Sequence, residues 1–268
     1  MDKRPIGVMD SGLGGLSVIR VLREQLPHES VIFVGDQGYF PYGTKTREQV
    51  QQLALRIGKF LVKQDVKMMI IACNTATAAA LQLLQNELPI PVIGVIEPGA
   101  RAATQHHYKK IGVIGTESTI KNGAYAKILA KLNPALGVIS SPAQPLVSIV
   151  EHGQTGTILA QKTVDTELEV FDNQSIEALI LGCTHFPFLQ KEIHNKLGAN
   201  VQLIDPAFET IRQARELLTS ENQLSVNYLT SRVELYSTGD VKDLVAGAQK
   251  WLPNRYNKCA HIQLNEED

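Results

Sequence analysis

The fold of this chain is constrained most by a regular alternation of short apolar runs with longer amphipathic segments. The run Met68-Met69-Ile70-Ile71 is apolar at every position. A strand with one face in water alternates between apolar and polar residues, so a continuous apolar run indicates a strand that is covered on both faces. Strands of this kind, separated by helices, form parallel sheets with helices on either side. The sequence therefore predicts an α/β fold with central parallel sheets.

The apolar runs predict the strands, and the periodic segments between them predict the helices. Strands are expected at residues 5–9, 31–34, 66–72, 90–95, 110–114, 136–140, 178–181 and 201–204. Helices are expected at residues 16–25, 47–64, 76–84, 122–132 and 187–196.

Two motifs recur in the same order at nearly the same spacing. The segment that begins at Ile6 resembles the one that begins at Ile111, 105 residues later. The segment around Cys73 resembles the one around Cys183, 110 residues later. The repeats predict two pseudo-symmetric α/β domains, with a break in the chain at Glu97-Pro98-Gly99. We expect the first domain to comprise residues 1–97 plus 208–268, and the second to comprise residues 98–207.

Composition excludes several classes of partner. The 268 residues include 26 lysines and arginines against 27 acidic residues, with no concentrated basic stretch, which argues against nucleic acid or an anionic membrane as partner. Continuous apolar runs stay below the length of about 18 residues that would indicate a membrane span, and the first residues do not resemble a signal sequence. We therefore expect a cytoplasmic protein. Its three cysteines do not make a disulfide framework, and in a reducing cytoplasm Cys73 and Cys183 would stay thiols.

Two of the cysteines occupy equivalent positions. Cys73 and Cys183 each follow a buried-type strand and precede a segment that can begin a helix. Ligands of such sheets bind at the carboxyl ends of the strands, where helix N-termini supply N–H groups and a positive dipole end. These features are expected to lower the pKa of each thiol towards neutrality, so that it can act as a base. The polar pairs that follow, Asn74-Thr75 and Thr184-His185, are suited to holding a carboxylate.

A symmetric pair of acid/base groups suits the inversion of a carbon centre. The α-proton of an amino acid must leave from one face while another proton arrives at the opposite face. Two groups from two facing domains can reach both faces, whereas one group cannot easily do so. One cysteine would begin as the thiolate and the other as the thiol, and they would exchange states in each turnover.

Other interpretations of the same residues stay open. Cys73 and Cys183 are of a residue type that is often simply buried, and Cys183 with His185 could ligate zinc, although further ligands at a typical spacing are missing. The glycines of the turn after the first strand, Gly12 and Gly14, nearly match a dinucleotide-binding fingerprint, with Asp36 as the acid that would bind the ribose. The third glycine of that fingerprint is missing, and a tight turn that needs glycine conformations is the simpler explanation. Cys259, near the polar C-terminus, is expected to have no role.

Taken together, six motifs resemble the glutamate racemase family of the aspartate/glutamate racemase superfamily. The motifs follow one another in order from Asp10 to His185, each of them alone is weak, and the resemblance as a whole covers the chain from Ile6 to about Asp240. Two of them, Pro41-Tyr42-Gly43 and Glu151-His152-Gly153, would otherwise be an ordinary turn and a helix end. The matching segments are Asp10-Ser11-Gly12-Leu13-Gly14-Gly15, Pro41-Tyr42-Gly43, Ala72-Cys73-Asn74-Thr75, Glu97-Pro98, Glu151-His152-Gly153 and Gly182-Cys183-Thr184-His185.

The resemblance implies two α/β domains with the active site in the cleft between them, and no cofactor or metal. It implies that Cys73 and Cys183 are the two acid/base residues, and that Asp10, Glu151 and His185 assist the proton transfers. Cys73 would be the base for D-glutamate and Cys183 the base for L-glutamate. The substrate would be held by Asp10, Ser11, Tyr42, Gly43, Asn74, Thr75, Thr184 and His185.

The resemblance also implies a biological role. D-glutamate feeds peptidoglycan synthesis, which implies a bacterial cytoplasm, and homodimers are common among relatives. Aspartate racemases, hydantoin racemases and maleate isomerases share the superfamily plan. The residues alone therefore indicate only a small carboxylate with an acidic Cα–H, and glutamate rests on the resemblance. A binding module that holds an amino acid without inverting it is the alternative from another class.

Overall fold

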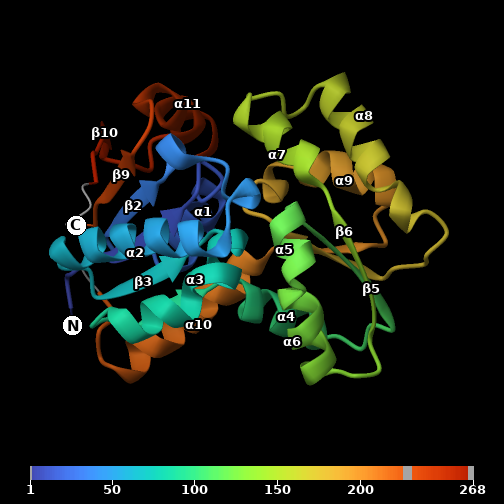
Figure 1. Cartoon of the computed structure of the whole chain (residues 1–268), viewed down its shortest axis with the longest axis horizontal. Helices are drawn as coiled ribbons and strands as arrows, with labels where there is room; N and C mark the ends of the chain where they lie inside the picture. The colour runs from blue at the N-terminus through green and yellow to red at the C-terminus, as the bar shows by residue number, and fades with distance from the viewer. Residues whose placement is uncertain (1, 226–230, 265–268) are drawn as a thin grey trace.

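The chain forms two lobes, each built on its own parallel sheet (Figure 1). The structure, a computed structural model, describes residues 2–225 and 231–264. Within these ranges, no helix is both long and apolar enough to cross a membrane. The α/β fold with two parallel sheets that the sequence predicts is confirmed.

The first sheet has six parallel strands in the order β10-β9-β2-β1-β3-β4. Strand β1 lies between β2 and β3, which places the residues that follow it at the middle of the sheet edge. The strands are β1 (Ile6–Asp10), β2 (Val31–Gly35), β3 (Met68–Ile71), β4 (Val92–Gly94), β9 (Val233–Ser237) and β10 (Lys258–His261).

The second sheet has four parallel strands in the order β6-β5-β7-β8. Strand β5 pairs with β7 as β1 pairs with β3 in the first sheet, so the two repeated motifs occupy corresponding places. The strands are β5 (Lys110–Gly115), β6 (Gly137–Pro142), β7 (Ala178–Gly182) and β8 (Gln202–Ile204).

Helices connect the strands and cover both faces of each sheet. They are α1 (Leu16–Gln25), α2 (Arg47–Lys63), α3 (Asn74–Glu87), α4 (Ile96–Thr104), α5 (Glu117–Asn122), α6 (Ala124–Leu132), α7 (Gln144–Glu151), α8 (Ile158–Glu167), α9 (Gln190–Leu197), α10 (Pro206–Ser220) and α11 (Val241–Trp251). Short 3-10 turns lie at Gln37–Tyr39, Tyr42–Thr44, Glu169–Phe171 and Phe186–Leu189.

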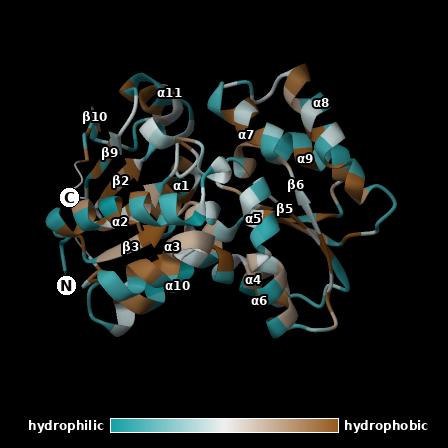
Figure 2. Ribbon diagram, viewed as in Figure 1, coloured by the Kyte–Doolittle hydropathy of each residue, from teal (hydrophilic) through white to brown (hydrophobic). Residues whose placement is uncertain are grey.

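The continuous apolar runs are explained by this two-sided cover. In β3, Met68 and Ile70 pack into a core with α1, α10 and α11, whereas Met69 and Ile71 pack on the other face against α2 and α3. All four side chains are buried, because each face of the strand has a helix layer above it. In Figure 2 the strand β2 is hydrophobic, whereas the visible face of α2 is largely hydrophilic.

Two local predictions are wrong. Glu97-Pro98-Gly99 does not break the chain but lies in the first turns of α4, where the early N–H groups have no helical acceptor and a proline is tolerated. The helix expected over residues 122–132 is divided at Gly123, whose φ of 66° is left-handed and ends α5 before α6 begins.

After residue 208 the chain returns to the first sheet. Helix α10 packs against both α1 and α4, and β9 and β10 then extend the sheet beyond β2. The domain boundaries at 97/98 and 207/208 stay a prediction.

A fully buried ion pair ties several segments of the first domain together. The Lys67 ammonium, just before β3, lies 2.6 Å from the Glu29 carboxylate, and both side chains are at most 1% exposed. Lys67 also donates to the carbonyls of Gln223 and Asp2, at 2.7 and 3.0 Å, while Glu29 accepts from the Ser225 N–H at 2.8 Å. In a buried charge pair of this kind, removing either residue leaves the other charge buried without a partner, which strongly destabilises the fold.

Replacing Lys67 with Met should lower the free energy of unfolding by about 3–5 kcal/mol, because Glu29 would be left as an uncompensated buried charge. Urea denaturation measures the change. The matched control is Lys121→Met, which removes an exposed i,i+4 pair with Glu117 and should cost less than about 0.5 kcal/mol. A Lys67→Met variant as stable as the control would contradict this account.

Candidate active site

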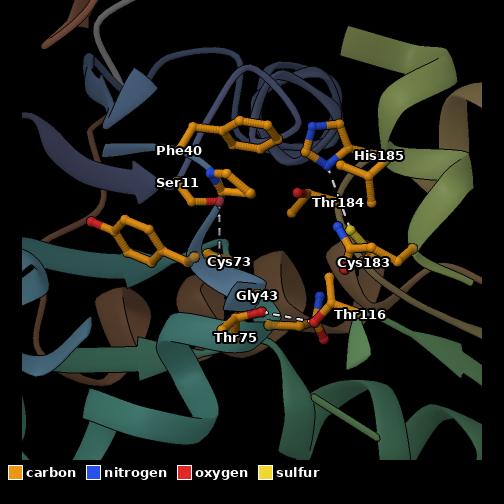
Figure 3. Close-up of a pocket in the computed structure, with 14 residues that line it drawn as sticks. Ser11, Phe40, Gly43, Cys73, Thr75, Thr116, Cys183, Thr184 and His185 are labelled. Carbon is orange, nitrogen blue, oxygen red and sulfur yellow. Dashed lines mark hydrogen bonds between the residues drawn. The ribbon is translucent and has the colours of Figure 1, made fainter. Parts of the chain in front are cut away.

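A pocket of about 320 Å³ lies where the carboxyl ends of the two sheets face each other (Figure 3). Residues from both domains line it, and most of them follow β1, β3, β5 or β7 directly. The lining residues are Ser11, Phe40, Pro41, Tyr42, Gly43, Cys73, Asn74, Thr75, Thr116, Gln144, Val147, Cys183, Thr184 and His185. Nine residues predicted from the sequence are among them, and the other two, Asp10 and Glu151, contact lining residues from behind.

Cys73 enters the pocket from the first domain. It is the N-cap of α3, and its sulfur accepts a hydrogen bond from the Ala76 N–H at 3.4 Å and contacts the Ser11 hydroxyl at 3.6 Å. Figure 3 shows Cys73 and Cys183 on opposite sides of the pocket. The two thiols therefore have the opposed placement that inversion of a carbon requires.

The pKa of Cys73 differs from the sequence-based expectation. Burial and the nearby Asp10 carboxylate raise the pKa of Cys73 to about 12, despite the opposing N–H of Ala76 at the start of α3. A helix N-terminus stabilises a thiolate, but complete burial removes more stabilisation by water than one N–H group returns. Cys73 is therefore a neutral thiol in the unliganded site.

Cys183 enters from the second domain and has a cationic partner. Its sulfur lies 3.5 Å from Nδ1 of His185, and Nε2 of His185 lies 2.5 Å from the Glu151 carboxylate at the end of α7. Burial alone would lower the pKa of His185, but Cys183 and Glu151 together raise it well above its ordinary value. His185 is therefore a protonated imidazolium between a sulfur and a carboxylate.

Asp10, at the end of β1, connects the two halves of the site. Its carboxylate accepts hydrogen bonds from the Thr184 hydroxyl at 3.2 Å and from the Gly12 N–H at 3.1 Å. Burial raises the pKa of Asp10 to about 6, although the positive charge of His185 opposes the rise. Asp10 can therefore change its protonation near neutral pH.

The glycine turn after β1 serves close approach between the domains. Gly12, Gly14 and Gly15 do not have left-handed backbone, so the expectation that this turn needs special glycine conformations is wrong. A Cβ atom on Gly14 would instead lie 2.4 Å from the Thr184 hydroxyl and 2.6 Å from the His185 ring. The turn is covered by the second domain and leaves no room above it for a bound pyrophosphate.

A network of hydroxyl groups lines the floor of the pocket. Oγ1 of Thr75 lies 3.0 Å from Oγ1 of Thr116, which in turn lies 3.0 Å from Oγ1 of Thr119. The Asn74 side chain accepts from the Tyr125 hydroxyl at 2.8 Å. These bonds join α3 of the first domain to α5 and α6 of the second.

Tyr42 forms a wall of the pocket. It is buried, and its hydroxyl hydrogen-bonds to Asp36, which also accepts from the Thr238 hydroxyl at 2.6 Å. Asp36 is thus used inside the first domain, which removes it from the role of a ribose-binding acid. Nearby, the centres of the Phe40 and His185 rings lie 6.1 Å apart, and the two ring planes are tilted by 48°.

Sequence reasoning missed five lining residues as site residues: Phe40, Pro41, Thr116, Gln144 and Val147. A signal for Thr116 existed, because it occupies in the second repeat the place that Ser11 has in the first. Gln144 and Val147 lie on α7, and only the packing of the two domains brings them to the pocket.

The geometry gives little support to zinc binding by Cys183 and His185 or to a role for Cys259. Cys183 and His185 are adjacent, but among residues 2–225 and 231–264 no third His, Cys, Asp or Glu completes a metal-binding group with them. Cys259 lies on β10, away from the lining residues, where burial raises its pKa.

Comparison with known proteins places the chain in one family. The profile of the Asp/Glu/hydantoin racemase family matches residues 6–214. A glutamate racemase of Limosilactobacillus reuteri is 89% identical over 267 residues, with 100% of both chains covered, and one of Limosilactobacillus fermentum is 55% identical over 269 residues, with 100% of both covered.

Solved structures of the same kind superpose over the full length. A glutamate racemase from Bacillus anthracis has a TM-score of 0.92 at 37% identity, covering 99% of this chain and 98% of its own. A glutamate racemase from Francisella tularensis in complex with D-glutamate has a TM-score of 0.90 at 35% identity, covering 100% and 99%. The chain therefore belongs to the Asp/Glu/hydantoin racemase family, within which it groups with the glutamate racemases.

Proposed function

We propose that this chain interconverts L- and D-glutamate by two-base proton transfer at Cα, with Cys73 and Cys183 as the bases. The observation that carries the proposal is the placement of two thiols at corresponding strand ends of two domains, on opposite sides of one pocket. Glutamate as the substrate is supported by the names of the relatives that match over the full length.

The protonation states favour a definite starting form. The raised pKa of Cys73 keeps its proton on the sulfur, and the imidazolium of His185 lies where it can pair with a thiolate at Cys183. In this form Cys183 removes the α-proton of the enantiomer that faces it, L-glutamate, while Cys73 delivers a proton to the other face. The reverse reaction begins from the opposite form, with D-glutamate facing Cys73.

The polar lining is suited to an amino acid with two carboxylates. The Thr75 and Thr116 hydroxyls and the N–H groups at the start of α3 can hold a carboxylate, as can Ser11, Gly43 and Asn74. The carboxylate of Asp10 lies behind the lining residue Thr184 and accepts a hydrogen bond from it, and it can assist Cys73 from there. Glu151 holds His185 in place through its 2.5 Å contact.

The wider role follows from this chemistry and from the resemblance to the family. We propose that the chain supplies D-glutamate for peptidoglycan synthesis in a bacterial cytoplasm, without a cofactor, and acts as a homodimer. Residues 1–97 plus 208–268 would then form the domain that carries Cys73, and residues 98–207 the domain that carries Cys183.

Incubation with L-glutamate in deuterated water, without added cofactor, should abolish both the α-proton NMR signal and the optical rotation. Inversion exchanges the α-hydrogen with the thiols, and the thiols exchange with solvent. Activity should persist in excess EDTA. A bound amino acid that keeps its α-proton would identify a binding module instead, and an EDTA loss that zinc restores would contradict the two-base mechanism.

Replacing Cys73 or Cys183 with Ser should each lower kcat by about 10²–10⁴-fold, because the serine hydroxyl is far less acidic and both residues act in every turnover. Serine nearly preserves the shape of cysteine, so folding and substrate affinity should change little. Cys259→Ser is the control for general thiol effects and should keep full activity. Near-normal turnover in either of the first two variants is the outcome that rules out the assignment.

The pH profile of kcat/KM should be a bell. It should rise through about pH 6, where Asp10, with a pKa of about 6, becomes an ionised carboxylate. It should fall again at alkaline pH, where His185 loses the proton that its raised pKa retains at neutrality. Asp10→Asn should remove the acid limb and leave the alkaline limb. A profile that is flat from pH 5 to 9 in the unmodified chain would refute this prediction.

A further inference from the structure

A second, smaller cavity, the internal cavity, shares Cys183 with the substrate pocket. It is formed where the ends of β3 and β7 meet the first turns of α1 and α10, and it has space for about one water molecule. Besides Cys183, its polar lining consists of Ser17, Asn74, Thr184 and Asp205. Cys73 does not line it.

Asp205, which lines this cavity, has a buried side-chain oxygen without a hydrogen-bond partner among the described residues. As the N-cap of α10, it accepts the Ala207 N–H at 2.9 Å through Oδ1. Its other oxygen, Oδ2, is buried and has no hydrogen-bond partner within the described residues. The residue as a whole is only 8% exposed, so bulk water does not supply the missing donor. A buried carboxylate oxygen without a donor is costly, so a water molecule in the cavity would relieve that cost.

Asp205 also faces a second space that is open to solvent. It lines a wide surface hollow between α4, α10 and β8, together with Ala102, Leu203 and Phe208. Asp205 is therefore common to the surface hollow and the internal cavity, and Cys183 is common to the internal cavity and the substrate pocket. From solvent towards the substrate, the order is therefore the surface hollow, then Asp205, then the internal cavity and finally Cys183.

The proposed two-base reaction creates a need for such a connection. After L-glutamate becomes D-glutamate, Cys183 carries the proton it removed and Cys73 has lost the one it delivered. The enzyme must return to its starting form before it can convert another L-glutamate. That reset requires proton exchange with solvent at two buried sulfurs.

We propose that Asp205, through one water molecule in the internal cavity, relays protons between Cys183 and solvent and so resets the enzyme between turnovers. In the reset after L-glutamate, the S–H bond of Cys183 breaks, its proton passes to the water, and a proton of that water passes to the Asp205 carboxylate. Asp205 then releases a proton to water in the surface hollow, and the Cys73 thiolate takes up one proton from water that enters the substrate pocket after D-glutamate leaves. The proposal rests on the proposed function, and Asp205 acts through Cys183 without contact with the substrate.

The charged groups around the cavity are consistent with this role. Burial raises the pKa of Asp205 to about 6, opposed by the Ala207 N–H and by the charge of Arg20 on α1. Both protonation forms are then accessible near neutral pH, as a proton relay requires. Tyr125 on α6 does not compete, because burial and the charges of Asp205 and Cys183 raise its pKa well above the ordinary value.

The test is Asp205→Asn, which keeps the capping ability of the side chain but cannot accept and release a proton. At low substrate concentration the two protonation forms of the free enzyme equilibrate between turnovers, so the rate of the reset does not affect kcat/KM. At saturating substrate the reset is part of every turnover, so its rate contributes to kcat. We expect kcat to fall by about 10²-fold, a typical contribution of a positioned proton-transfer group, with kcat/KM within about twofold of the unmodified value.

A tracer experiment measures the reset directly. Labelled L- and D-glutamate at equilibrium are mixed with a large excess of unlabelled L-glutamate. If the reset is slow, the enzyme accumulates in the form that binds D-glutamate, and label transiently accumulates in the L enantiomer. Asp205→Asn should show this transient more strongly than the unmodified chain. A merely structural role of Asp205 would not produce it.

Two further variants complete the design. Asp240→Asn is the matched control, because Asp240 caps α11 by accepting the Lys242 N–H at 2.9 Å and lines neither cavity. It should leave kcat and the label distribution unchanged. Val18→Ile keeps Asp205 but adds a methylene group to the wall of the internal cavity, which should displace the water. We expect this variant to lower kcat and to leave kcat/KM nearly unchanged.

The outcomes separate this proposal from the proposed function. If Asp205→Asn and Val18→Ile keep normal kcat and show no tracer transient, the relay is wrong although the unmodified chain still racemises glutamate. A parallel loss of kcat and kcat/KM in Asp205→Asn would also overturn it, since that loss indicates structural damage. If the unmodified chain does not invert glutamate at all, the proposed function itself has failed.

Discussion

The geometry of this site depends on the direct contact between the turn after β1 and the turn after β7. Thr184 donates to Asp10, and Ser17 donates to the Thr184 carbonyl at 2.9 Å, so the two domains are joined by buried hydrogen bonds at the carboxyl ends of their sheets. Gly14 has no space for a Cβ atom at this contact. Because a lost buried hydrogen bond leaves an unpaired polar group, these contacts favour one relative position of the domains. The separation of the two thiols follows from that position.

The two halves of the site share a plan but differ in electrostatics. Cys73 shares its surroundings with a carboxylate, Asp10, whereas Cys183 lies beside an imidazolium that is held by Glu151. The low dielectric of the buried site strengthens both effects. A repeated backbone therefore presents two chemically identical thiols in unlike electrostatic environments.

Much of the site could be predicted because each of the two repeats places polar residues directly after the equivalent strands. Ser11 and Thr116, like Asn74 and Thr184, occupy corresponding positions after corresponding strands, and all four line the pocket. Thr116 nevertheless lies outside the set of site residues that the motifs predict. Gln144 carries no such mark, and its place in the pocket follows from the packing of α7 against the first domain.

The sequence by itself determined the class of fold, the repeated unit and the two cysteines at equivalent strand ends. These properties are local, because the period of apolar residues decides whether a segment becomes a strand or a helix, and short polar turns follow it. The tertiary structure alone decided the raised pKa of Cys73, the reason for Gly14 and the unsatisfied oxygen of Asp205. Each of these depends on how much water is removed from a group and on which distant segments approach it, and neither quantity is encoded in neighbouring residues.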